Sequence, residues 1–290
     1  MKVAGFTFIR NALKFDYPVV EAIRSILPIC DEVVVAVGDS EDGTRALIES
    51  IDKDKIRIID TVWDDSLRAG GQVLAVETDK AFAAVASDSD WAFYIQGDEV
   101  MHERYLDVVR NAMQQYKDDT QIDGLLFNYA HFYGSYDYVA DSRDWYRKEI
   151  RVIRNDKNIR SYRDAQGFRK SDNSKLRVKP IEAWMYHYGW VKHPKQQSAK
   201  AQNFNRYWHD DQWVEKNISK EELFDYSAIK SLKHFEDTHP RVMQARIEQK
   251  NWFFAFDPTK KRLPLKHRLS NFIEKYTGYR IGEYKNYIVV

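Results

Sequence analysis

Two adjacent carboxylates end an apolar run in the stretch Gln96-Gly97-Asp98-Glu99. The run before them, residues 91–95, has the length and composition of a buried strand. Such a strand would deliver Asp98 and Glu99 to the carboxyl edge of a sheet, which is where open α/β sheets bind ligands. Adjacent carboxylates beside a flexible glycine suit a hard divalent cation that also holds substrate phosphates. The alternative is that both residues cap the next helix, since carboxylates are favoured at a helix N-terminus.

The segments that must position this stretch alternate between apolar runs and helical patterns. Strands are predicted at 2–9, 32–37, 56–59 and 91–95, and helices between them at 12–27, 44–51 and 72–86. This β-α-β order with parallel crossovers predicts an α/β fold, in which helices cover both faces of a mostly parallel sheet. Neither G-x-G-x-x-G nor G-x-x-x-x-G-K-[ST] occurs, so the sequence has no dinucleotide fingerprint and no P-loop.

After the acidic stretch the strands become shorter and aromatic residues become frequent. The predicted elements are a helix at 104–116, strands at 124–129, 149–154, 176–178 and 181–188, and an aromatic loop at 131–138. From residue 191 onward the chain is polar and is predicted to be helical, with scattered tryptophans and tyrosines.

Composition limits the classes of partner. The chain has 290 residues and a net charge of +1, so no overall field favours nucleic acid. Residues 230–290 carry 13 Lys and Arg against 6 Asp and Glu, which suits either peripheral contact with an anionic membrane surface or a solvated helical surface. The single cysteine, Cys30, the absence of a recognisable signal peptide and the lack of a ~20-residue apolar span predict a cytoplasmic protein, or one at the inner face of the membrane.

Three segments, taken in order, resemble a family 2-type glycosyltransferase with the GT-A fold. The first is the opening FIRNA…VEAIRSILPICDEVVVAVGDSEDGTRALIE, and the second is DWAFYIQGDEV, which resembles the strand carrying the acidic metal-binding motif. The third is the order of WYRKEIRVIR, a carboxylate in RDAQGF, and His187-Tyr188, which resembles the bacterial branch that builds lipopolysaccharide cores. The resemblance covers residues 1–215 and leaves 216–290 as a helical, basic and aromatic C-terminal extension.

This resemblance implies inverting transfer of a sugar from a nucleotide-sugar donor to the hydroxyl of a glycan or lipid-linked acceptor, in surface glycan or lipopolysaccharide-type synthesis. It implies a divalent cation, Mn²⁺ or Mg²⁺, that neutralises the leaving diphosphate and is held by Asp98, Glu99 and His187. It also implies that Asp164 is the base that accepts the acceptor proton. Two alternatives stay open. His187 could be a partly buried histidine bonded to backbone, and Asp164 could be the partner of nearby arginines.

The nucleotide is expected to lie across the carboxyl ends of the first strands, near a helix N-terminus whose amides suit anionic groups. The residues expected to bind it are Phe8, Arg10, Asn11, Asp39, Arg68, Gln72, Gln96 and Gly97. The aromatic residues of 131–138, together with Trp145, Tyr146 and Trp190, are candidates either to stack on acceptor sugars or to pack in the core.

Two positions depart from the resembled pattern. Gln96 stands where the family has the first aspartate of its metal motif, and a neutral amide is a poorer ligand for a hard cation. Val37 stands near the usual nucleotide-contacting aspartate, for which Asp39 is the candidate substitute. These departures support a catalytically weak or silent nucleotide-sugar-binding protein as the alternative. A sugar nucleotidyltransferase is a further alternative, although residues 5–10 do not form the Gly-rich phosphate loop that it would need.

Overall fold

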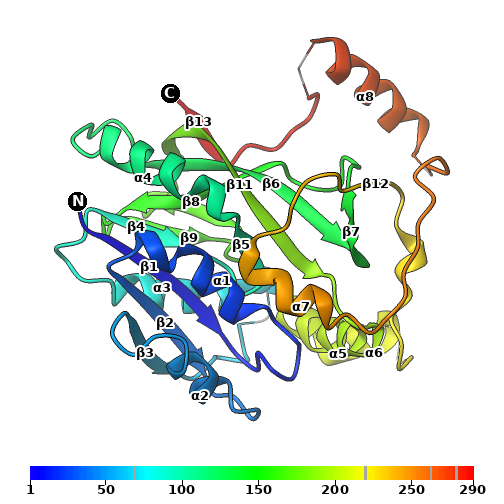
Figure 1. Cartoon of the computed structure of the whole chain (residues 1–290), viewed down its shortest axis with the longest axis horizontal. Helices are drawn as coiled ribbons and strands as arrows, with labels where there is room; N and C mark the ends of the chain where they lie inside the picture. Colours follow the sequence, from blue (N-terminus) through cyan, green and yellow to red (C-terminus); the bar gives the residue numbers. More distant parts are fainter. Residues whose placement is uncertain (68, 219–220, 262, 278–279) are drawn as a thin grey trace.

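The apolar runs in the first hundred residues form a parallel half-sheet in the computed structural model, which describes residues 1–67, 69–218, 221–261, 263–277 and 280–290 (Figure 1). Its strands are β1 (Val3–Ile9), β2 (Glu32–Gly38), β3 (Ile56–Thr61) and β4 (Trp91–Tyr94), in the spatial order β3-β2-β1-β4. All of these neighbours pair in parallel. The connections contain α1 (Val19–Ile26), α2 (Thr44–Glu49) and α3 (Gln72–Ala83). The predicted α/β class is therefore confirmed.

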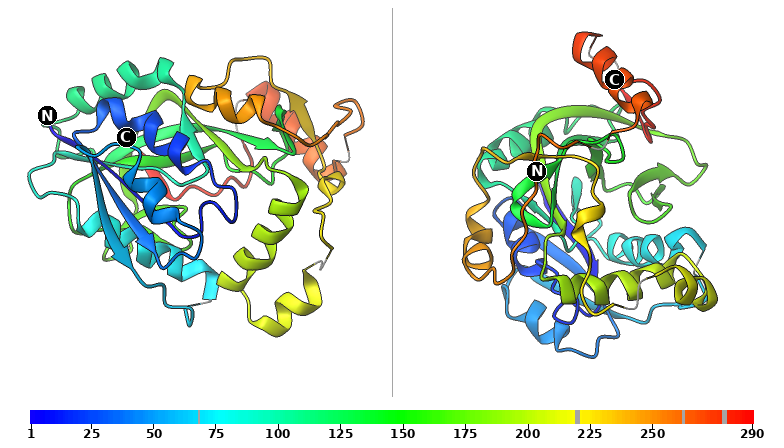
Figure 2. Two further views of the ribbon diagram at one scale, coloured as in Figure 1. Left: turned by 60° about the horizontal axis from the view of Figure 1, so that its bottom comes forward. Right: turned by 90° about the vertical axis from the view of Figure 1, so that its right-hand side faces the viewer.

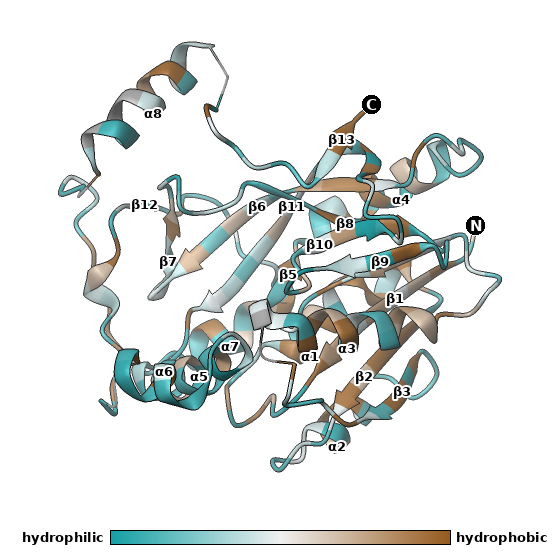
Figure 3. Ribbon diagram, turned by 180° about the vertical axis from the view of Figure 1, so that it is seen from behind, coloured by the Kyte–Doolittle hydropathy of each residue, from teal (hydrophilic) through white to brown (hydrophobic). Residues whose placement is uncertain are grey.

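Both faces of these strands are apolar because each face is covered by helices. Along β2, Val33 and Val35 pack with residues of α1 and α4 (Leu106–Gln115), whereas Val34 and Ala36 pack with residues of α3. The alternation follows from the two-residue period of a strand. The brown colouring of β1 and β2 and the teal of α5 (Pro194–Phe204) and α6 (Asp211–Asn217) show the contrast between the apolar sheet and these polar helices (Figure 3).

Beyond β4 the sheet becomes mixed. Up to residue 190 it adds β5 (Glu99–Met101), β6 (Gly124–Tyr133), β7 (Ser135–Ala140), β8 (Lys148–Arg154) and β11 (Leu176–Trp190). β8 pairs antiparallel with both β4 and β6, and β11 runs parallel to β6. A separate two-stranded ribbon joins β9 (Ile159–Tyr162) to β10 (Gly167–Lys170).

Two sequence predictions are wrong in this half. The segment 131–138 was expected to be a loop, but β6 continues to Tyr133 and turns at Gly134 into β7. The two strands expected at 176–178 and 181–188 form one strand, β11, which shifts register against β6 in the interval around Pro180. In both cases pairing with distant strands extends elements that the local pattern interrupts.

Residues 216–290 also differ from the predicted helical extension. They add β12 (Leu232–His234) beside β7 and β13 (Tyr287–Val289) beside β11, so part of this segment belongs to the sheet. Its helices are α7 (Gln244–Glu248) and α8 (Leu265–Thr277), and the right-hand view of Figure 2 shows α8 set away from the sheet. Within the described residues, no helix is long and apolar enough to cross a membrane.

Candidate functional site

A cavity of about 440 Å³ opens at the carboxyl ends of β1 and β4. Residues 8–10 and 96–98, which follow these parallel strands, form its floor, and α5 (Pro194–Phe204) contributes a wall. This is the edge at which the sequence predicts a ligand site, since parallel strands direct their ends to one side of the sheet.

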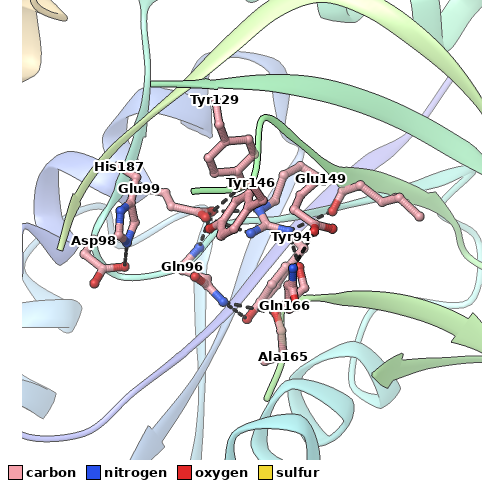
Figure 4. A network of polar contacts seen from close by, with 12 residues as sticks. Tyr94, Gln96, Asp98, Glu99, Tyr129, Tyr146, Glu149, Ala165, Gln166 and His187 are labelled. Carbon is pink, nitrogen blue, oxygen red and sulfur yellow. Dashed lines mark hydrogen bonds and ion pairs between the residues drawn. The ribbon is translucent and has the colours of Figure 1, made fainter. Parts of the chain in front are cut away.

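The two adjacent carboxylates point into different regions. Asp98 lines the cavity, whereas Glu99 is fully buried behind it. Both oxygens of Glu99 accept hydrogen bonds from Arg151, at 2.7 and 2.8 Å, and Tyr129 donates a further bond to Oε1 at 2.8 Å. Figure 4 shows Asp98 beside His187, and Glu99 in a separate network of hydrogen bonds that includes Tyr129. Both oxygens of Glu99 are thus occupied by Arg151, and Glu99 neither lines the cavity nor caps a helix. This differs from its expected role as a metal ligand.

Asp98 is held between cationic and imidazole groups. Its Oδ2 accepts a hydrogen bond from Lys200 at 3.0 Å, and its Oδ1 lies 3.7 Å from His187 Nε2. Burial alone would raise the pKa of Asp98, but the ammonium group of Lys200 holds it well below its usual value. Asp98 is therefore ionised at neutral pH. His187 reaches it because β11 pairs antiparallel with β5, which sets His187 opposite Glu99.

The contact between His131 and His187 determines which nitrogen of His187 carries the proton. His131 Nε2 lies 2.8 Å from the carbonyl oxygen of Tyr146, which can only accept, so this nitrogen carries the proton. Burial and the neighbouring His187 lower the pKa of His131, which is therefore neutral with Nδ1 as an acceptor. His187 Nδ1, 3.2 Å away, must then be the donor. Because burial also lowers the pKa of His187, its Nε2 is an unprotonated acceptor directed at Asp98.

These residues fit a divalent cation that takes its other ligands from a substrate. Asp98 Oδ1 and His187 Nε2 lie 3.7 Å apart, and both atoms can serve as ligands to a cation. Gly189 keeps the adjoining space open, since a Cβ there would lie 2.7 Å from both Asp98 Oδ2 and His187 Nε2. Among the described residues no cluster of three His, Cys, Asp or Glu side chains could hold a metal alone. A cation such as Mg²⁺ is commonly bound by one or two protein ligands together with phosphates and water.

Asp164 lies on the same cavity, in a tight loop between β9 and β10. Burial raises the pKa of Asp164 above its usual value. Its neighbours Arg163 and Ala165 have positive φ angles of 57° and 64°, which cost of order 1–3 kcal/mol each for residues other than glycine. Of the three arginines expected as alternative partners of Asp164, Arg160 bonds to backbone carbonyls and Arg169 to Asn286. The third, Arg163, bonds to Tyr162, although its charge partly offsets the raised pKa of Asp164. The loop therefore presents a carboxylate suited to accept a proton.

The expected nucleotide edge holds an aromatic cluster beside a cation. The Trp63 ring lies 5.7 Å from Phe8 and 5.3 Å from Tyr207, and the Arg10 guanidinium lies 5.6 Å from Trp63. All four line the cavity. Trp63 packs over Gly38, where a Cβ would overlap the indole. The buried Trp63 Nε1 has no hydrogen-bond partner among the described residues.

Not every predicted nucleotide residue reaches the cavity. Gln96 and Gly97 line it, and Asp39 adjoins it by accepting a hydrogen bond from Arg10 at 3.2 Å. Asn11 instead accepts from the amide of Glu41 at 2.9 Å and joins two loops. Gln72 is exposed at the start of α3 and does not line the cavity. Arg68 lies outside the described residues.

The predicted aromatic residues Trp145, Tyr146 and Trp190 do line the cavity, so they are available to a ligand there. Sequence reasoning missed Trp63, Tyr207 and Lys200. Lys200 lies on a polar helix 102 residues beyond Asp98, and nothing in its local sequence marks it. Trp63 could have been found because a lone tryptophan follows the third strand, on the edge where the ligand was expected.

No protein-family model and no curated protein matches the chain in sequence. Among solved structures, residues 1–349 of S. aureus TarS match with a TM-score of 0.40 at 12% identity, covering 77% of this chain and 67% of that one. Glucosyl-3-phosphoglycerate synthase from Mycobacterium tuberculosis, in complex with Mn²⁺, UDP and phosphoglyceric acid, matches at 0.30 and 17%, covering 45% and 43%. A 4-diphosphocytidyl-2C-methyl-D-erythritol synthase from Anaerococcus prevotii matches at 0.38 and 12%, covering 66% and 91%. These overlaps carry no conclusion about ligand or activity.

Proposed function

We propose that this protein is an inverting glycosyltransferase with a GT-A-type fold that uses a nucleotide-sugar donor and a divalent cation. One observation carries the proposal. A single cavity at the carboxyl edge of the parallel strands brings together Asp98, whose Oδ1 lies 3.7 Å from His187 Nε2, and Asp164, a carboxylate with a raised pKa. A site for an anionic leaving group and a base for an attacking hydroxyl are the two requirements of this reaction.

The nucleotide is assigned to the side of the cavity formed by Phe8, Trp63 and Tyr207. These rings offer flat apolar surfaces to a base. The Arg10 guanidinium lies 5.6 Å from the Trp63 ring and can contact ribose or phosphate oxygens, although it now bonds to Asp39. In this arrangement the diphosphate lies toward Asp98, where Lys200 supplies a further positive charge.

The reaction is a single displacement at the anomeric carbon. The acceptor oxygen forms a bond to that carbon from the side of Asp164, and the bond from carbon to the diphosphate oxygen breaks on the opposite side. Asp164 accepts the hydroxyl proton, the nucleoside diphosphate leaves with the electron pair, and the configuration inverts. Asp98 and His187 would hold the divalent cation, which when bound neutralises charge on the leaving diphosphate.

The acceptor is assigned to the aromatic wall of Trp145, Tyr146 and Trp190, because sugar rings stack on aromatic faces. A glycan or lipid-linked acceptor of the surface-glycan or lipopolysaccharide type fits this wall. The basic segment 230–290 would suit an acceptor presented at an anionic membrane surface.

The test measures melting temperature against a panel of nucleotide sugars, with and without Mn²⁺ or Mg²⁺, followed by release of nucleoside diphosphate. A ligand that binds only the native state raises the melting temperature, and we expect one donor to do so in a metal-dependent manner. The shift should disappear in Asp98→Asn and persist in Asp88→Asn, a control at an exposed aspartate that pairs with Lys2. No shift with any donor and cation would contradict the proposal. Metal-dependent binding without turnover would favour a silent binding protein.

A further inference from the structure

The loop that carries Asp164 is held in a backbone conformation that its own residues disfavour. Arg163 and Ala165, on either side of Asp164, both have positive φ angles. Neither is glycine, so this conformation persists only where surrounding contacts impose it.

Gln96 makes one of these contacts directly. Its side-chain Nε2 donates a hydrogen bond to the carbonyl oxygen of Ala165 at 3.0 Å, and Tyr94 OH accepts from the same nitrogen at 3.4 Å. Figure 4 shows the Gln96 amide directed at Ala165. This bond needs a donor at position 96. An aspartate or glutamate there would be ionised and could only accept, so it would face the carbonyl with a like partial charge.

Glu99 makes the second contact through Arg151. Glu99 binds the Arg151 guanidinium through two hydrogen bonds, and Arg151 Nη1 donates to the carbonyl oxygen of Gln166 at 3.0 Å. Gln166 in turn donates to Glu149 at 2.8 Å. On the other side of the loop, Asp164 packs on Gly71, where a Cβ would lie 2.9 Å from the Asp164 Cβ.

We propose that Gln96 is a positioning residue for Asp164: its amide fixes the carbonyl of Ala165 and thereby aims the Asp164 carboxylate into the cavity. Glu99, acting through Arg151, fixes the next carbonyl of the same loop. Gln96 and Glu99, which flank Gly97-Asp98 in the sequence, thus position the loop that carries Asp164. Of these three charged or amide side chains, only Asp98 serves the leaving group. This inference rests on the proposed transferase function, in which Asp164 is the base.

The experiment compares Gln96→Met, which keeps length and neutrality but removes the donor, with the isosteric Gln96→Glu. We expect kcat to fall about 10- to 100-fold, because a catalytic group displaced by about 1 Å loses that much. The dissociation constant for the nucleoside diphosphate with Mn²⁺ should stay within about twofold of the native value. Weaker nucleotide binding with unchanged kcat would overturn the proposal and make Gln96 a donor-binding residue.

A double variant shows whether Gln96 acts through Asp164. If it does, Gln96→Met combined with Asp164→Asn should have the same kcat as Asp164→Asn alone, because effects on one shared group are not additive. Effects that multiply would overturn the proposal, since Gln96 would then act independently of Asp164.

A last measurement does not need turnover, so it separates failure of this inference from failure of the proposed function. Amide hydrogen exchange across residues 163–167 should speed up in Gln96→Met and stay unchanged in Gln114→Met, a control at an exposed glutamine of α4. Unchanged exchange in Gln96→Met would overturn the positioning role. If exchange is faster but the protein transfers no sugar, the hydrogen bond from Gln96 to Ala165 holds the loop, and Asp164 is not a catalytic base.

Discussion

Asp98 and Glu99 are consecutive carboxylates, but one faces a cavity and the other a sealed interior. In the cavity region Asp98, His187 and Lys200 are only partly paired, with 3.7 Å between the imidazole Nε2 and the nearer carboxylate oxygen. In the interior region Glu99 and Arg151 are both fully buried, and both oxygens of Glu99 are bonded.

The two regions differ because one contains groups that can bind a ligand and the other contains groups that hold them in place. Groups that must bind a ligand keep unused hydrogen-bonding or ligand capacity, since a fully paired group has nothing to offer. Groups that support them are paired completely, because an unpaired buried charge is costly. The interior pair is one of these supporting groups, and it connects the start of β5, at Glu99, to the loop that carries Asp164.

The largest expected effect comes from breaking the interior pair. Glu99→Gln leaves Arg151 buried without its counter-ion, which should lower the free energy of unfolding by about 3–5 kcal/mol. Asp98→Asn should cost clearly less, because Lys200 retains the carbonyl of Gly189 as an acceptor at 2.9 Å. Chemical denaturation of both variants measures the difference. Equal losses would show that the two regions do not differ in this way.

The second prediction concerns the cavity region. Asp98→Asn should lower kcat by roughly 10²- to 10³-fold, which is the usual effect of removing one electrostatic contact to a transition state. Mn²⁺ affinity, measured by electron paramagnetic resonance in the presence of nucleoside diphosphate, should fall as well. If the variant keeps both the native kcat and the native Mn²⁺ affinity, Asp98 is not part of the metal site.

A third prediction concerns Glu149, a second buried glutamate on which the charge of Arg151 acts. Glu149 Oε2 has no hydrogen-bond partner among the described residues, and burial raises the pKa of Glu149 from 4.5 to about 7. The folded protein therefore holds a proton that the unfolded chain releases, and the stability that this proton provides is lost as pH rises from 4.5 to 7. Glu149→Gln has no such loss, so its stability relative to the native protein should increase by about 3 kcal/mol across this window.

Urea denaturation at several pH values between 4 and 8 tests this prediction. A stability difference between Glu149→Gln and the native protein that does not change with pH would contradict it, and would mean that Glu149 is already ionised in the folded state.

The smallest expected effect concerns Lys200, whose ammonium group bonds to Asp98. Lys200→Met should strengthen Mn²⁺ binding by roughly tenfold, because it removes a like charge beside the cation, and tenfold corresponds to about 1.4 kcal/mol. Lys195→Met is the matched control, since Lys195 lies on the same helix and pairs with Glu222 at an exposed position. Weaker Mn²⁺ binding in Lys200→Met would mean that the ammonium supports the site.

The first half of the fold was predictable because its signals are local. Residues 32–37 and 91–95 are continuous apolar runs, and such runs form strands that are buried on both faces. β2 and β4 appear where these runs predict them, at Glu32–Gly38 and Trp91–Tyr94. The later strands were less predictable, since β11 is completed by pairing with β6, β5 and β13 rather than by its own pattern.

The sequence by itself determined that Arg10 and Asp98 would come to the same edge of the sheet, because they follow the parallel strands β1 and β4. Only the tertiary structure decided how each side chain is used. Asp98 and Glu99 have the same charge and adjacent positions, and they are distinguished by Arg151 on one side and by His187 and Lys200 on the other. These partners come from distant elements, so their arrangement follows from strand pairing and packing rather than from any local pattern.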